Sequence, residues 1–192
     1  MKRSLGAKTI GFPTPVFLVG TYDEQEKPNI MAAAWGGICC SDPPRLCVSL
    51  REATYSHAAI AAREAFTVSI ASERQVAEAD YAGIASGRKV DKFDKAGLTP
   101  VHSTLTDAPY VEQCPVVIEC KLVHTLNLGL HTQFVGEILD VKADETVVDD
   151  HGAIDMTKVA PFVYIPGSRT YHSLGRKLAD AFRVGRELMI DD

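Results

Sequence analysis

No stretch of this 192-residue sequence is long and apolar enough to cross a bilayer, and no run of Lys or Arg occurs. The first five residues contain a Lys-Arg pair, but no apolar segment of signal-peptide length follows it. The net charge of -5 also disfavours an anionic partner, because no basic run offsets it. We therefore expect a cytoplasmic protein that binds neither nucleic acid nor membranes.

Motifs for metal, disulfide and dinucleotide sites are missing as well. The five cysteines show no C-x-x-C spacing, the histidines are scattered, and no H-E-x-x-H occurs, so neither a disulfide framework nor a metal site is predicted. No G-x-G-x-x-G follows an apolar segment, and the sequence lacks a regular β-α-β alternation. These absences disfavour a doubly wound α/β fold.

Short apolar segments with a two-residue period predict a mainly β protein. Val116, Ile118 and Cys120 are apolar while the intervening Glu119 and Lys121 are charged, as in a half-buried strand. Further strands are predicted at 16–19, 46–50, 66–70, 131–142 and 161–165, and one begins at residue 29. About seven strands with antiparallel connections indicate a closed or nearly closed barrel.

Three or four helices are predicted between these strands. Ser56 can cap a helix over 57–65, and Ser72 with Gln75 has the form of a capping box for a helix reaching about residue 85. A short helix over 91–96 ends at Gly97, and a closing helix is predicted over 175–184. Without repeats or a convincing boundary, residues 1–192 are expected to form one domain with its core at about 12–186.

The segment from Asn29 to Arg51 is rich in small residues and carries the only tryptophan, Trp35, followed by Gly36 and Gly37. Small side chains let a flat ligand approach the backbone closely, and main-chain groups can then hydrogen-bond to its edge. A flavin ring fits this description. The alternative is that Trp35 is a core aromatic residue and the two glycines mark a β-bulge.

Two segments could receive the phosphate of a flavin nucleotide. One leads into a helix amino terminus, where unpaired N–H groups favour an anion, and comprises Arg51, Thr54, Tyr55 and Ser56. The other combines a hydroxyl group, a glycine and two cations, in Ser86, Gly87, Arg88 and Lys92. The alternative for this second segment is a helix C-cap with solvated basic residues. The sequence does not decide which cation contacts phosphate.

The order and spacing of NIMAAAWGG, CSDPPRLCVSLR, SGRKVDKF and GLHTQFVGEILDV resemble the flavin reductase-like domain of the FMN-binding split-barrel proteins, most closely the flavoredoxin type. The resemblance implies a Greek-key split barrel that pairs as a homodimer and binds FMN. It places both phosphate segments near the phosphate and ribityl chain. It also implies cofactor contacts from Asn29, Met31, Ala33, Ala34, Trp35, Gly36, Ser49 and Leu50.

His131 is the candidate catalytic residue. The resemblance aligns it with a Gly-Asp-His segment that approaches the flavin and nicotinamide in many flavin reductases, but Leu130 stands here in place of the Asp. A lone histidine in a strand is otherwise usually structural. Hydride transfer itself needs no acid or base from the protein, because the cofactor supplies the chemistry.

The resemblance leads us to expect an NAD(P)H:flavin oxidoreductase, which transfers hydride from a nicotinamide dinucleotide to FMN and passes electrons to free flavin, a ferric chelate or a protein acceptor. One alternative is a flavoredoxin-like electron carrier that is reduced by a partner protein without direct NAD(P)H oxidation. Another is flavin binding without turnover. Neither the preferred nicotinamide nor the acceptor follows from the sequence.

Overall fold

A seven-stranded antiparallel sheet forms the body of the protein in the computed structural model, which describes residues 1–189. Positions 190–192 of the predicted domain lie outside the described residues. The strand order is β3-β2-β6-β9-β10-β5-β4. In chain order the strands are β2 (Phe17–Tyr22), β3 (Pro28–Ala33), β4 (Gly36–Ser41), β5 (Pro44–Arg51), β6 (Ala65–Ile70), β9 (Val116–Asn127) and β10 (His131–Ala143).

The connection between β3 and β4 requires this sheet to curl. The two strands lie at opposite ends of the strand order, yet only Ala34 and Trp35 separate them in sequence. So short a link spans only about 10 Å, so the two edges must approach each other. The Ser49 N–H donates to the Trp35 carbonyl at 2.7 Å and holds the link against β5. The prediction of a mainly β, Greek-key split barrel is confirmed. The strands β3 and β4 are not paired with each other, and the chain passes from one to the other at Trp35.

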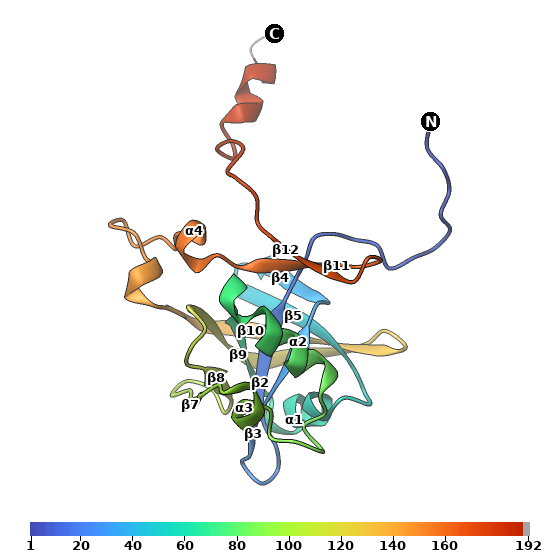
Figure 1. The fold of residues 1–192 in the computed structure, drawn as a ribbon, viewed down its shortest axis with the longest axis vertical. Helices are drawn as coiled ribbons and strands as arrows, with labels where there is room; N and C mark the ends of the chain where they lie inside the picture. The colour runs from blue at the N-terminus through green and yellow to red at the C-terminus, as the bar shows by residue number, and fades with distance from the viewer. Residues whose placement is uncertain (190–192) are drawn as a thin grey trace.

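Two small sheets complete the fold. One comprises β1 (Thr14–Pro15), β11 (Phe162–Ile165) and β12 (Thr170–Ser173), and the other β7 (Pro100–His102) and β8 (Pro109–Val111). The strands β11 and β12 cross one end of the barrel near β4, and both terminal segments extend away on that side (Figure 1). The sequence analysis does not predict β1, β7, β8 and β12, because strands of two to four residues depend on tertiary pairing.

The predicted helices are found between the strands, but the structure corrects two of the predictions. Thr54, not Ser56, is the N-cap residue of the first helix, and Ser56 lies buried in its first turn. The predicted closing helix over 175–184 is wrong: the last helical element is a short 3-10 segment further along the chain. The helical elements are α1 (Tyr55–Arg63), η1 (Glu73–Gln75), α2 (Val76–Ile84), α3 (Lys92–Ala96), η2 (Glu145–Val147), α4 (Met156–Val159) and η3 (Val184–Met189).

Local side-chain contacts explain which helix predictions succeed. The capping box is confirmed, since the Ser72 N–H donates to Gln75 Oε1 at 2.9 Å. Asp91 caps α3, and Gly97 ends it with a φ of 64°. The closing segment lacks such support: the Phe182 side chain is 94% exposed, and a short helix that buries no apolar face is unstable.

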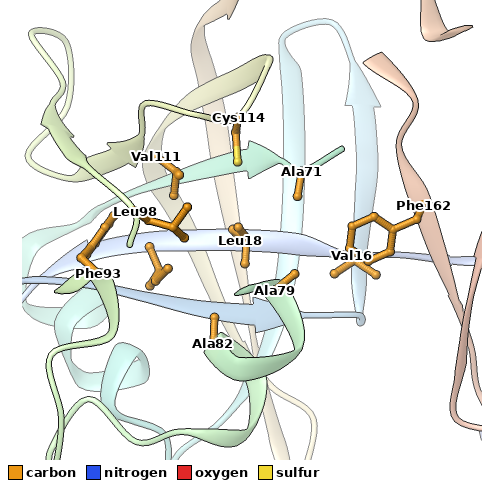
Figure 2. Close-up of a cluster of buried hydrophobic side chains, with 11 residues drawn as sticks. Val16, Leu18, Ala71, Ala79, Ala82, Phe93, Leu98, Val111, Cys114 and Phe162 are labelled. Carbon is orange, nitrogen blue, oxygen red and sulfur yellow. The ribbon is translucent and has the colours of Figure 1, made fainter. Parts of the chain in front are cut away.

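Strand β2 separates two hydrophobic cores. Phe17 and Val19 point into the barrel, where they join a cluster that includes Phe66 and Phe134. Leu18 points to the opposite face, toward α2 and α3 (Figure 2). The strand is therefore buried on both sides, and α2 is packed against β3, next to the Ala34–Trp35 link.

Candidate functional site

Three cavities surround the end of β3, and each carries part of the predicted set of site residues. The "α1 cavity", of about 200 Å³, lies between α1, α2 and the loop after α2. The "Trp35 cavity", of about 480 Å³, adjoins it, since Gly83 lines both. The "His131 cavity", of about 540 Å³, shares Ala34 and Trp35 with the second. Eight predicted residues line the α1 cavity: Met31, Thr54, Tyr55, Ser56, Ser86, Gly87, Arg88 and Lys92.

The amino terminus of α1 supplies donors to the α1 cavity. Thr54 makes no side-chain cap; its hydroxyl instead donates to the Arg51 carbonyl at 2.8 Å. The first-turn N–H groups have no acceptor within the helix, because the partners they would need lie before its start. Together with the helix dipole, these groups favour an anion at this point.

Arg88 brings the loop after α2 to the same helix end. Its guanidinium donates to the Ala53 carbonyl at 2.8 Å and lies 5.6 Å from the centre of the Tyr55 ring. The Tyr55 hydroxyl donates to Asp23 at 2.5 Å, and this carboxylate raises the pKa of Tyr55. Arg88 itself forms no ion pair with a carboxylate in the part of the chain that the structure describes. The charge of Arg88 is therefore not neutralised by a carboxylate of the described residues.

Asn29 packs against two residues that line the α1 cavity, Ser56 and Gly87. Its Nδ2 donates to Ser56 Oγ at 2.9 Å, whereas its buried Oδ1 has no partner among residues 1–189. Gly87 passes so close that an added Cβ would lie 2.3 Å from Asn29 Oδ1. A buried acceptor without a partner is costly, and a donor on a bound ligand would satisfy it. This acceptor, the open α1 terminus and Arg88 fit a flavin nucleotide.

Lys92 faces the α1 cavity but is already engaged. Its Nζ donates to the Ala82 carbonyl at 2.7 Å, and the side chain is buried. Burial disfavours the ammonium ion and lowers the pKa of Lys92 to about 8. Of the three candidate phosphate cations, Arg88 and Lys92 line this cavity, whereas Arg51 lines the Trp35 cavity. Arg88 is the exposed one of the two and Lys92 the buried one, so Arg88 is the better placed to meet a ligand.

The shifted pKa of Lys92 predicts a pH dependence of stability. Unfolded, the lysine titrates near its ordinary value of 10.5, so between about pH 8 and 10.5 the unfolded chain binds more protons than the folded chain. Raising the pH through this window therefore stabilises the fold. Relative to Lys92→Met, the wild-type free energy of unfolding should rise by about 1–3 kcal/mol between pH 7 and pH 10, measured by urea unfolding. A difference that stays constant with pH would contradict the assignment.

The Trp35 cavity joins the β3–β4 link to the end of the β11–β12 hairpin. Trp35 is half-buried and lines two cavities, so it is not a core aromatic residue. Gly36 is required by packing, because an added Cβ would lie 2.6 Å from the Cys47 carbonyl. The β-bulge of β4 falls further along, between Ile38 and Cys40. Predicted residues in this cavity are Ala33, Ala34, Trp35 and Arg51.

Sequence reasoning missed part of this wall. Tyr164, Arg169 and Tyr171 line the Trp35 cavity from the β11–β12 hairpin, more than a hundred residues from Trp35 in sequence. The Tyr171 hydroxyl donates to Asp80 at 2.9 Å, and burial raises the pKa of Tyr171 to about 12. The sequence feature that could have predicted this hairpin is the Gly167–Arg169 turn between two short aromatic segments.

The remaining predicted residues lie elsewhere. Gly36, Ser49 and His131 line the His131 cavity, on the other side of Trp35, together with residues 8–11 of the amino-terminal segment. Leu50 points into the barrel core and lines none of the three cavities. The structure therefore brings His131 near Trp35 but not into the α1 cavity with Arg88.

Two other sequence predictions concern absences. Within residues 1–189, no helix is both long and apolar enough to span a membrane. The same residues contain no group of three or more His, Cys, Asp or Glu side chains suited to hold a metal ion.

The barrel and its adjoining cavities suit a flat ligand with an anionic group. The chain belongs to the flavin reductase like domain family, whose model matches residues 9–174. Flavoredoxin of Desulfovibrio vulgaris (Miyazaki F) is 56% identical, with 96% of this chain and 100% of that chain covered and a TM-score of 0.93. Flavoredoxin from Methanosarcina acetivorans is 29% identical over 98% of each chain, with a TM-score of 0.88.

A curated relative adds a redox activity to the comparison. The ferric-chelate reductase (NAD(P)H) of Archaeoglobus fulgidus is 33% identical over 103 residues, which cover 53% of this chain and 60% of that protein. The predicted family, fold and FMN cofactor are confirmed by these similarities taken together.

Proposed function

We propose that the α1 cavity holds the phosphate and ribityl chain of FMN and that the flavin ring lies toward the Trp35 cavity. The observation that carries this proposal is the uncapped amino terminus of α1 facing Arg88. Both groups attract an anion. Asn29 Oδ1 can accept a hydrogen bond from the ligand, and the backbone at Ala33 and Ala34 allows close approach of a ring edge.

We further propose that the protein is an NAD(P)H-dependent flavin oxidoreductase. When bound, FMN supplies a ring that accepts a hydride or single electrons. The chain's own residues then orient the partners and limit access by water. Trp35 separates the two larger cavities, and the His131 cavity beyond it offers space for a nicotinamide or an acceptor. His131 lies at the wall of that space, where it can donate a hydrogen bond to such a partner.

A flavoredoxin-like electron carrier is the second candidate. It is favoured by the 56% identity to a flavoredoxin over almost the whole chain. In this case a partner protein reduces the flavin, and NAD(P)H does not. The open His131 cavity would then serve as the surface through which electrons pass.

We also infer that two copies of the chain pair as a homodimer. Exposed apolar side chains gather at the β9–β10 hairpin, in Leu126, Leu128 and Leu130, and such groups are usually covered by a partner. Light scattering should give the mass of a dimer.

Anaerobic addition of NADH and then NADPH to the purified, FMN-loaded protein distinguishes the two candidate functions. Loss of the visible flavin absorbance on either addition is expected, and subsequent addition of a ferric chelate should restore it. A spectrum that persists with both nucleotides but is lost after chemical reduction would favour the carrier. Failure to bind FMN at all would contradict both.

A further inference from the structure

A pair of cysteines lies on the edge of the barrel, outside the proposed cofactor site. Strand β4 is an edge strand, and within residues 1–189 it pairs only with β5. Ile38 pairs with Leu46 and Cys40 with Arg45, so Cys39 is the additional residue of a β-bulge. One position earlier in the register, Gly37 pairs with Cys47. Cys39 is thus the diagonal neighbour of Cys47 on the same face of the ladder.

Gly37 leaves space for the two thiols to meet. An added Cβ on Gly37 would find no atom within 4 Å, so nothing covers Cys47 from that position. Burial and the adjacent Cys39 thiol both raise the pKa of Cys47. Gln133 Nε2 donates to Cys47 Sγ at 3.5 Å and holds this sulfur on the outer face of β5. Cys39 itself is exposed to solvent.

The other three cysteines are placed differently. Burial raises the pKa of Cys114 and of Cys120 to about 12, so these thiols stay protonated and unreactive. Cys40 follows Cys39 directly, but its Sγ donates to the Asp42 carbonyl at 3.3 Å, within the β4–β5 turn. Cys40 is therefore a matched control for Cys39: the same residue type, on the same strand, with a different orientation.

We propose that Cys39 and Cys47 form a reversible dithiol–disulfide pair that is oxidised by exchange with a small-molecule disulfide such as glutathione disulfide. The exposed Cys39 thiolate attacks one sulfur of glutathione disulfide and expels one glutathione thiolate. The Cys47 thiolate then attacks Cys39 Sγ in the mixed disulfide and expels the second. Two protein thiols and one glutathione disulfide thus give one protein disulfide and two glutathione thiols.

Such a bond would join the edge strand to its neighbour close to the proposed site. Gly36, three residues before Cys39, and Ser49, two residues after Cys47, both line the His131 cavity. The disulfide would therefore fix β4 against β5 where the strand leaves Trp35. Because Cys47 has a raised pKa, closure of the bond should accelerate as the pH rises.

The test treats the reduced full-length protein with glutathione disulfide and measures its mass before and after tryptic digestion. Cleavage after Arg45 separates residues 46–51, whose one cysteine is Cys47, from the peptide with Cys39 and Cys40. We expect the intact protein to lose two hydrogen atoms and the two peptides to become linked, with reversal by dithiothreitol.

Variants decide which thiols are involved. Cys40→Ala should still form the link, whereas Cys39→Ala and Cys47→Ala should not. Retained FMN binding by each variant shows that it has folded. A lasting glutathione adduct on Cys39 without an internal link, no reaction, or a link that survives in Cys39→Ala would each overturn the proposal.

Discussion

Gly87→Ala should raise the FMN dissociation constant at least about tenfold, a loss of about 1.4 kcal/mol or more in binding free energy. The new Cβ would lie 2.3 Å from Asn29 Oδ1 and 2.6 Å from the Tyr55 ring. Asn29 is buried and bonded to Ser56, so it cannot easily withdraw. The loop would move instead and would carry Arg88 away from the amino terminus of α1. Titration of the apoprotein with FMN, followed by flavin fluorescence, measures the change.

Gly175→Ala is the matched control, because an added Cβ there meets no atom within 4 Å. Its FMN dissociation constant should equal that of the wild type. If Gly87→Ala bound FMN as tightly as this control, the α1 cavity could not be the phosphate site. The phosphate would then be sought beside Arg51 and Arg169 in the Trp35 cavity.

Gly20→Ala should lower the free energy of unfolding by about 3 kcal/mol or more, because it overpacks the middle of the sheet. An added Cβ would lie 1.9 Å from the Pro109 carbonyl oxygen and 2.5 Å from Thr67 Oγ1. These two atoms are themselves joined by a hydrogen bond of 2.5 Å, which the methyl group would break. The obstacle is main chain on a neighbouring segment, so no change of side-chain rotamer relieves it.

Urea unfolding of the apoprotein measures this loss, with an unchanged m-value as evidence that only stability has changed. Gly11→Ala provides the comparison, since an added Cβ there also meets no atom within 4 Å. Its effect should stay within about 0.5 kcal/mol. A loss below about 1 kcal/mol in Gly20→Ala would show that the β8 segment can move away from β2 at little cost.

Features that depend on neighbours in sequence were predicted well. The long hairpin of β9 and β10 follows from a two-residue period on both sides of an Asn-Leu-Gly turn. The capping box at Ser72 and the stop at Gly97 follow from residue types at fixed offsets. Thr54 and Ser56 show the limit of such reasoning. Both hydroxyl residues can cap a helix, and the contact of Ser56 with Asn29, which lies on strand β3, distinguishes them.

The sequence by itself determined the periodic strands, the small-residue segment around Trp35 and the basic loop after α2, because periodicity, side-chain size and charge are properties of short segments. Only the tertiary structure decided what these segments can do together. It buried Lys92 against a backbone carbonyl, placed the exposed Arg88 at the amino terminus of α1, and directed Leu50 into the core. It also brought the β11–β12 hairpin to Trp35. Burial and long-range proximity depend on how the whole sheet closes, and no local pattern encodes that closure.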